Sequence, residues 1–198
     1  MAKLSEPLDA ATGQQIDAVL KRLSNSKDVG ADLLQVLDIA IGIMGADMGT
    51  LQRFDERADC LTIVASRGFS SEALSFFGVI RRDTNTTCAA ALTRRMRVFV
   101  ENVSTSYLFV GTRELDMLRA GGIAAAHSTP LISSTGSLWG VFTMHFREPQ
   151  IENEFDHAPL DRLAVQVADC LEQREGLVPN QHFHGKQVPE DSQPWRLK

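Results

Sequence analysis

The 198-residue chain has a net charge of −5, and 43% of its residues are hydrophobic and 23% charged, which is typical of one globular domain with extensions. Acidic and basic residues are mixed along the chain, without the basic stripe of a nucleic-acid-binding protein. No run approaches the roughly 20 apolar residues of a membrane span, and the first residues lack the apolar core of a signal peptide. We therefore expect a cytoplasmic protein that binds neither nucleic acid nor membrane.

The three cysteines, Cys60, Cys88 and Cys170, are odd in number and far apart in the chain. None forms a Cys-x-x-Cys pair or a cluster with histidine at zinc-ligand spacing. We therefore predict reduced thiols and no bound metal.

Residues 1–27 are predicted to form a leader followed by a helix. Thr12 and Gln15 have the spacing of a capping box, in which two side chains satisfy free backbone groups at a helix start. A second helix is predicted to begin after Asp28, a favoured N-cap residue, and to end at Gly45, because glycine readily adopts the left-handed conformation of a helix end.

The hydrophobic period then changes from helical to strand-like. Residues 48–54 and 60–66 are β-prone runs around a polar turn, which predicts a hairpin. Short helices are predicted over 70–77 and 86–95, followed by a strand over 97–100.

The last third of the folded region begins with a helix over 112–122, which has glycines at its end. Strands over 123–133 and 137–146 follow, and Pro130 indicates an edge position or a bulge because proline cannot donate to a strand ladder. An amphipathic helix over about 160–171 closes this region. The order of elements favours an α+β domain built on an antiparallel sheet.

From about residue 176 the chain is rich in proline, glutamine and charge and has no apolar period. We predict that residues 176–198 form a flexible tail.

Two histidines and a serine on the predicted long strands raise the question of a catalytic pair or a metal site. His127 and Ser128 are adjacent, so they point to opposite faces of a strand and cannot easily share a proton. A hairpin loop of three or five residues would put His127 and His145 on one face, and a loop of two or four would not. No third ligand lies near them in the sequence, so we predict neither a catalytic pair nor a metal site.

Cys88 falls at the start of a predicted helix, where free N–H groups and the helix dipole lower the pKa of a thiol. Thr86 and Thr87 add hydroxyl groups that suit a polar or anionic ligand at the same place. The alternative is that Cys88 is a small buried hydrophobic residue and that one threonine simply caps the helix.

Taken together with this order of elements, the sequence resembles the GAF domain family from about Asp28 to Glu175. It is most similar to the GAF sensors found before bacterial histidine kinases. Five stretches, several of them in the family's order, carry the resemblance: LLQVLDIAIGIMGADMGTLQRFD, LTIVASRGFSSEALSFF, CAAALTRRMRVFVENV, FVGTRELDMLRAGGIAAAHSTPLIS and GSLWGVFTMHFREP.

The resemblance implies a GAF-like domain over residues 28–175, with a central antiparallel sheet of five to six strands and helices on both faces. Short helices and loops from the middle of the chain would form a ligand pocket on one face. The first and last helices would cover the other face and commonly pair with those of a second subunit. Carried over by position, the candidate ligand-binding residues are Phe77, Thr87, Cys88, Phe109, Leu115, Leu118 and, on the following strand, His127.

The chain also departs from several ligand-binding patterns of the family. Thr86 and Ala89 stand where related sensors often have glycine, and Ala89 replaces the histidine that follows the cysteine in bilin-binding photoreceptors. The signature of the cyclic-nucleotide-binding members is missing. Cys60 and Cys170 are poorly placed to partner Cys88, as relatives that reduce free methionine sulfoxide would require.

The resemblance implies a signalling module of a bacterial two-component type with no enzymatic activity of its own, either stand-alone or a piece of a larger receptor. It would sense a small molecule, dimerise through its first and last helices, or both, and its partner would be a histidine kinase or another signalling protein. The ligand and any cofactor stay open. The alternatives are a thiol-based redox sensor or reductase using Cys88 and a pigment-bearing photoreceptor.

Overall fold

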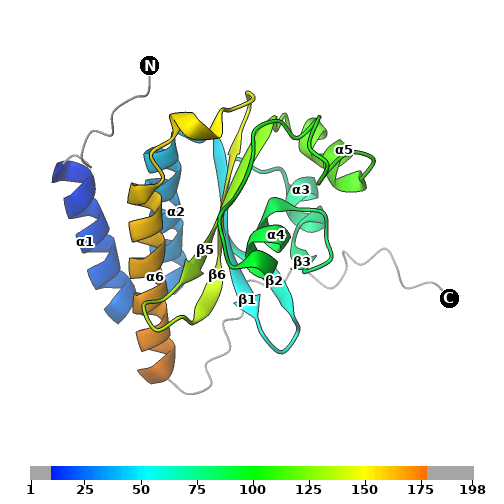
Figure 1. The fold of residues 1–198 in the computed structure, drawn as a ribbon. Coiled ribbons are helices and arrows are strands. Elements are labelled where there is room, and N and C mark those ends of the chain that lie inside the picture. Colours follow the sequence, from blue (N-terminus) through cyan, green and yellow to red (C-terminus); the bar gives the residue numbers. More distant parts are fainter. Residues whose placement is uncertain (1–9, 178–198) are drawn as a thin grey trace.

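The structure, a computed structural model, describes residues 10–177 and contains a six-stranded antiparallel sheet in the order β3-β2-β1-β6-β5-β4 (Figure 1). The predicted α+β class with an antiparallel sheet is confirmed. The strands are β1 Met48–Asp55, β2 Cys60–Arg67, β3 Val79–Arg81, β4 Val98–Val100, β5 Ala125–Ile132 and β6 Leu138–Phe146.

Helices cover both faces of the sheet (Figure 1). The long α2 and α6 pack on one face, and α1 packs outside them against both helices. Three short helices, α3 to α5, lie on the other side. The helices are α1 Ala10–Asn25, α2 Val29–Met44, α3 Ser71–Phe76, α4 Thr87–Arg94, α5 Arg113–Ala120 and α6 Ala158–Leu177, with a 3₁₀ turn η1 at Glu152–Glu154. Within residues 10–177, none of these helices combines the length and apolarity needed to cross a bilayer.

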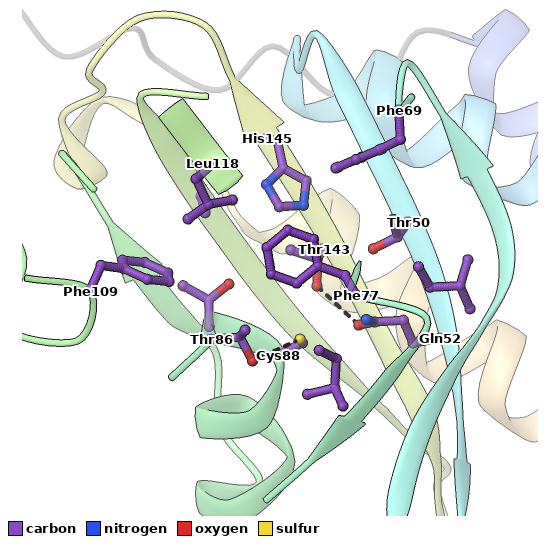
Figure 2. Close-up of a pocket in the computed structure, with 14 residues that line it drawn as sticks. Thr50, Gln52, Phe69, Phe77, Thr86, Cys88, Phe109, Leu118, Thr143 and His145 are labelled. Carbon is purple, nitrogen blue, oxygen red and sulfur yellow. Dashed lines mark hydrogen bonds between the residues drawn. The ribbon is translucent and has the colours of Figure 1, made fainter. Parts of the chain in front are cut away.

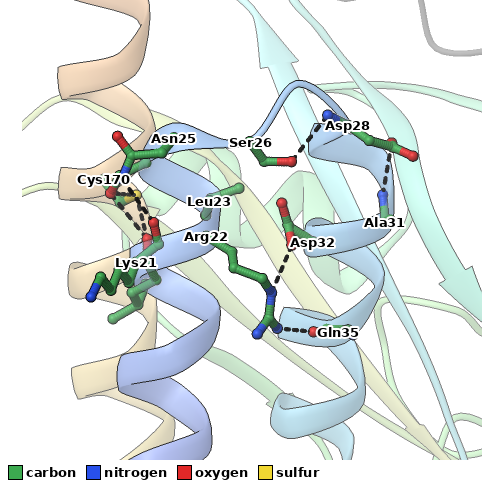
Figure 3. Close-up of polar contacts among 12 residues, drawn as sticks. Lys21, Arg22, Leu23, Asn25, Ser26, Asp28, Ala31, Asp32, Gln35 and Cys170 are labelled. Atoms are coloured by element: carbon green, nitrogen blue, oxygen red, sulfur yellow. Dashed lines mark hydrogen bonds and ion pairs between the residues drawn. The ribbon is translucent and has the colours of Figure 1, made fainter.

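The predicted ends of α2 are confirmed, but the predicted start of α1 is not. The Asp28 side chain accepts a hydrogen bond from the Ala31 N–H at the start of α2 (Figure 3). Gly45 ends that helix with a φ of 59°. The predicted capping box is wrong, because α1 already includes Ala10 and therefore places Thr12 inside the helix. The leader and the predicted tail lie outside the described residues, except that α6 continues as far as Leu177.

Polar contacts also join α1 to its neighbours (Figure 3). Arg22 on α1 donates to Asp32 on α2 across 3.3 Å, and the Ser24 hydroxyl lies 3.2 Å from the Cys170 thiol on α6. The apolar side chains between these helices belong to the largest core cluster. The three long helices therefore form one connected layer.

A β-bulge in the long hairpin decides which side chains of β6 face which layer. Five residues, 133–137, connect the strands, and Ile132 pairs with Leu138. The next pair is Leu131 with Gly140, so Trp139 is an extra residue on β6. Because side chains alternate along a strand, one extra residue exchanges the two faces beyond it.

The bulge separates the two histidines. A regular five-residue hairpin would put them on one face, but His127 pairs with Met144, and His145 pairs with Ala126. His127 therefore faces the layer of long helices and His145 the opposite side. Strand β5 is not an edge strand, but β4 pairs with it only from Ala126 to Ser128. Pro130 lies beyond that pairing and is therefore at an edge of the sheet, as expected.

Gly140 lies where β6 approaches the backbone of β1 most closely. A Cβ atom at this position would overlap the carbonyl oxygen of Gln52 and lie 3.1 Å from its carbonyl carbon and 3.2 Å from the Cα of Arg53. The residue pairs with Arg53 on one side and Leu131 on the other, at the centre of the sheet. Only glycine fits here without moving a backbone.

Candidate functional site

A cavity of about 30 Å³ lies between the sheet and the segments that contain α3, α4 and α5 (Figure 2). This volume holds one or two water molecules. Apolar and uncharged polar side chains line the cavity: Thr50, Gln52, Ile63, Phe69, Phe77, Ile80, Thr86, Thr87, Cys88, Phe109, Leu118, Ala126, Thr143 and His145.

The structure brings most of the sequence-predicted residues together. Those that line the cavity are Phe77, Thr87, Cys88, Phe109 and Leu118. Leu115 lies behind this lining, packed in one cluster with Phe109 and Leu118. These six positions therefore lie at the cavity or next to it.

The predicted position of His127 is wrong, because its side chain lies on the other face of the sheet. The centroid of its ring lies 5.3 Å from that of Phe99 and 5.1 Å from that of His157. Its Nε2 is 3.1 Å from the Thr129 hydroxyl. Burial lowers the pKa of His127 to about 3, and the charges on His157 and Arg97 add to this effect. His127 is thus a neutral core residue of the helix layer.

Ser128, next to His127, points toward the cavity side and takes part in a hydroxyl network. Its Oγ donates to the Thr87 hydroxyl at 2.8 Å and lies 2.9 Å from that of Thr143. The Thr143 hydroxyl donates in turn to Gln52 at 3.5 Å. As strand alternation predicts, His127 and Ser128 point to opposite faces of β5.

Cys88 is a buried thiol at the start of α4 (Figure 2). Its Sγ donates to the Thr86 hydroxyl at 3.2 Å, and the same hydroxyl accepts from the Ala89 N–H and caps the helix. Burial raises the pKa of Cys88 despite the hydrogen bonds that lower it. The expected lowering by the helix start is therefore outweighed by loss of hydration.

His145 is the pocket histidine that the sequence reasoning missed. Figure 2 shows its imidazole between Leu118 and Phe69, and the Phe69 ring contacts it edge-on with centroids 5.0 Å apart. Burial lowers the pKa of His145 to about 3. Within residues 10–177, its Nδ1 is one of a few buried side-chain atoms without a hydrogen-bond partner.

Several other lining residues were also missed, because they come from strands whose orientation was unknown. Thr50 and Gln52 on β1 and Thr143 on β6 face the cavity. Polar residues at alternate positions of a buried strand are a signal that could have found them. The described part of the chain contains no cluster of three or more His, Cys, Asp or Glu residues that could hold a metal ion.

Comparison with known proteins places this arrangement in a family. A family model of the GAF domain matches residues 27–172. No match was found among curated protein sequences.

Solved structures with the same fold span several activities. The GAF domain of an Acinetobacter phosphoenolpyruvate-protein phosphotransferase superimposes with a TM-score of 0.64 at 16% identity, covering 88% of this chain and 98% of that one. A domain of a Sinorhizobium meliloti 1021 protein named as a two-component sensor histidine kinase gives 0.58 at 24% identity, over 77% and 96%. The free methionine-R-sulfoxide reductase of Neisseria meningitidis, in complex with its substrate, gives 0.66 at 17% identity, over 90% and 99%. At these identities the likeness shows the fold.

Proposed function

Because the chain belongs to the GAF domain family, we propose that it is a cytoplasmic signalling module that senses a small molecule in the cavity under α3 to α5 and has no catalytic output. Binding would shift the long helices on the other face of the sheet. The lining residues predicted from the sequence would contact the ligand, with His145 in place of His127.

One observation carries this proposal: neighbouring residues of β1 connect the cavity to the end of α6. Gln52 lines the cavity, and the next residue, Arg53, forms an ion pair with Glu175 at 3.1 Å. Trp139, the bulged residue of β6, donates from its indole N–H to the same Glu175 at 2.9 Å. A displacement of β1 by a ligand would therefore change the contacts that hold α6.

Further polar contacts extend this connection to the hairpin and to α1. The Ser134 N–H donates to Asp169 on α6 at 2.7 Å, and the Thr135 hydroxyl to Glu172 at 2.8 Å. On the far side of α6, Arg174 donates to the backbone carbonyl of Ser26 at 2.7 Å. Movement of α6 would thus reach the end of α1.

The same helices are our proposed output surface. Helices α1 and α6 lie side by side and away from the cavity (Figure 1), and Val165 on α6 is 41% exposed. We propose that they bind a second copy of the chain, forming a homodimer, and that a histidine kinase or another signalling protein reads their position.

Native mass spectrometry of the freshly purified protein tests the proposal first. We expect a dimer that carries a small molecule, and we expect hydrogen exchange in the last two turns of α6 to slow when the molecule is present. A monomer at high concentration, together with exchange in α1 and α6 that no bound molecule changes, would contradict the mechanism.

Two variants separate binding from output in the same experiment. Ala126→Val adds two methyl groups to a cavity of about 30 Å³ and is expected to abolish binding. Glu175→Gln keeps an acceptor for Trp139 but removes the charge that faces Arg53, so it should leave binding unchanged and weaken the response of α6. Thermal melting followed by circular dichroism checks that both variants are folded.

A thiol-based redox sensor or reductase is the second candidate, since one structural neighbour is a free methionine-R-sulfoxide reductase. The burial and raised pKa of Cys88 argue against it. Cys60 and Cys170 are also buried and belong to other parts of the fold, with no disulfide between any of the three.

We predict that Cys88 reacts with iodoacetamide at least tenfold more slowly than a free thiol near neutral pH, because the thiolate is scarce and shielded. Mass spectrometry of the labelled peptide against a free-cysteine standard measures the rate, and a Cys88→Ser variant identifies the modified position. Labelling faster than the standard would favour the redox function.

A further inference from the structure

The lining of the cavity carries no permanent charge. None of its 14 residues is Asp, Glu, Lys or Arg. The two titratable groups are uncharged near neutral pH, since burial raises the pKa of Cys88 and lowers that of His145 to about 3. A carboxylate, phosphate or ammonium ligand would leave water without meeting an opposite charge, which strongly opposes binding.

The start of α4 does not supply the missing positive charge. Thr86 occupies its N-cap, and the Thr86 hydroxyl accepts from the Ala89 N–H at 3.2 Å while the Thr86 carbonyl accepts from Ala90. The Cys88 thiol fills the space beside that cap and bonds to the same hydroxyl. The Thr86 cap and the Cys88 thiol therefore already occupy part of this helix start, which leaves less of it open to an anion.

Most polar side chains of the lining already have hydrogen-bond partners within the protein. The Thr87 and Thr143 hydroxyls contact Ser128, and Gln52 accepts from Thr143. His145 differs, because its side chain is aimed into the cavity and its Nδ1 has no partner within residues 10–177 (Figure 2). A buried polar atom without a partner is unfavourable, so a ligand that bonds to it gains affinity.

Aromatic rings set the shape of the space around His145. Phe69, Phe77 and Phe109 line it from three separate segments. Figure 2 shows the Phe77 ring beside His145, and Phe77 is only partly buried, at the end of α3. The cavity of about 30 Å³ is too small for an organic ligand, but outward rotation of Phe77 would free the volume of one benzene ring.

We propose that this cavity selects an uncharged, single-ring aromatic molecule of the phenol class, which replaces the Phe77 ring and forms a hydrogen bond with His145 through its one polar group. The inference rests on the proposed sensing function, because it names the ligand class of the same cavity. His145 is the residue that distinguishes a phenol from a hydrocarbon of the same size.

Three probes test the class at about pH 7.5: phenol, toluene and benzoate. Phenol is neutral at this pH and benzoate is ionised, as for the tyrosine and glutamate side chains. We expect phenol to bind about tenfold more tightly than toluene and at least a hundredfold more tightly than benzoate. Titrations followed by ¹⁵N–¹H correlation spectra of the full chain give the three dissociation constants and show whether cavity residues respond.

Two substitutions at His145 test the hydrogen bond itself. His145→Leu should weaken phenol binding about tenfold more than it changes toluene binding, since only phenol uses the imidazole. His145→Gln, which keeps a polar group at this position, should restore part of the affinity for phenol. Thermal melting confirms that each variant is folded.

The outcomes separate this inference from the sensing function. Benzoate binding within tenfold of phenol, or phenol binding that His145→Leu does not weaken, overturns the phenol class. If none of the probes binds but native mass spectrometry finds a charged molecule to which α6 responds, the ligand class is wrong and the sensing function stands. If no molecule is found and α6 is unresponsive to every probe, both fail.

Discussion

A Gly140→Ala variant is expected to lose most of its folded structure, with a free energy of unfolding lowered by more than about 4 kcal/mol. The new Cβ would overlap the carbonyl oxygen of Gln52 on the neighbouring strand. Backbone atoms at the centre of a sheet cannot rotate away as a side chain can, so β1 and β6 would have to separate. A loss of this size is comparable with the whole stability of a small domain. Urea unfolding followed by circular dichroism measures it.

Gly42→Ala is the matched control for this substitution. Gly42 lies inside α2, and a Cβ there would meet no atom within 4 Å. The same change of side chain should therefore stabilise the protein by up to about 1 kcal/mol, through helix propensity. If Gly140→Ala unfolded at the same urea concentration as the unmodified protein, the close approach of β1 and β6 would be refuted.

The second large effect is a loss of stability in mild acid. His127 and His145 are buried, and burial lowers the pKa of each from 6.5 to about 3 in the folded state. Below about pH 6.5, the pKa of histidine in the unfolded chain, the unfolded chain binds protons that the folded chain does not accept. The free energy of unfolding therefore falls as pH falls from about 6.5 toward 3. Together the two histidines should reduce the free energy of unfolding by about 4 kcal/mol between about pH 7 and pH 5.

Urea unfolding at several pH values in this range tests the prediction. Burial also lowers the pKa of His157, so this residue adds to the loss of stability as pH falls. A His127→Phe variant keeps a ring against Phe99 but removes one proton-binding site, so its stability should depend less steeply on pH. Stability that does not change between about pH 7 and pH 5 would show that these imidazoles are hydrated.

Much of the fold could be predicted because the signals are local. Asp28 and Gly45 bound α2 through their own backbone preferences, and β1 and β2 follow from runs of β-prone residues. Strand β3, Val79–Arg81, was missed because three residues are too short to show a period. Its position depends on pairing with β2, and that information is not local.

The candidate site could be predicted only in part, for a similar reason. Positions such as Thr87, Cys88 and Phe109 follow from the order of elements in the family, so the resemblance located them near the cavity. The choice between His127 and His145 depends on the register of β6, which the extra residue at Trp139 changes. A count of loop residues alone selects the wrong face.

The bulge at Trp139 also bears on how such domains diversify. Deleting or inserting one residue at this point would reverse the orientation of every side chain between it and the end of β6, without any change in strand order. Residues that now pack against the long helices, such as Met144, would then face the cavity, and His145 would turn toward the long helices. Hairpin length is therefore a heritable means of changing which side chains line the cavity. Alignments that treat a one-residue gap there as neutral will compare side chains from opposite layers.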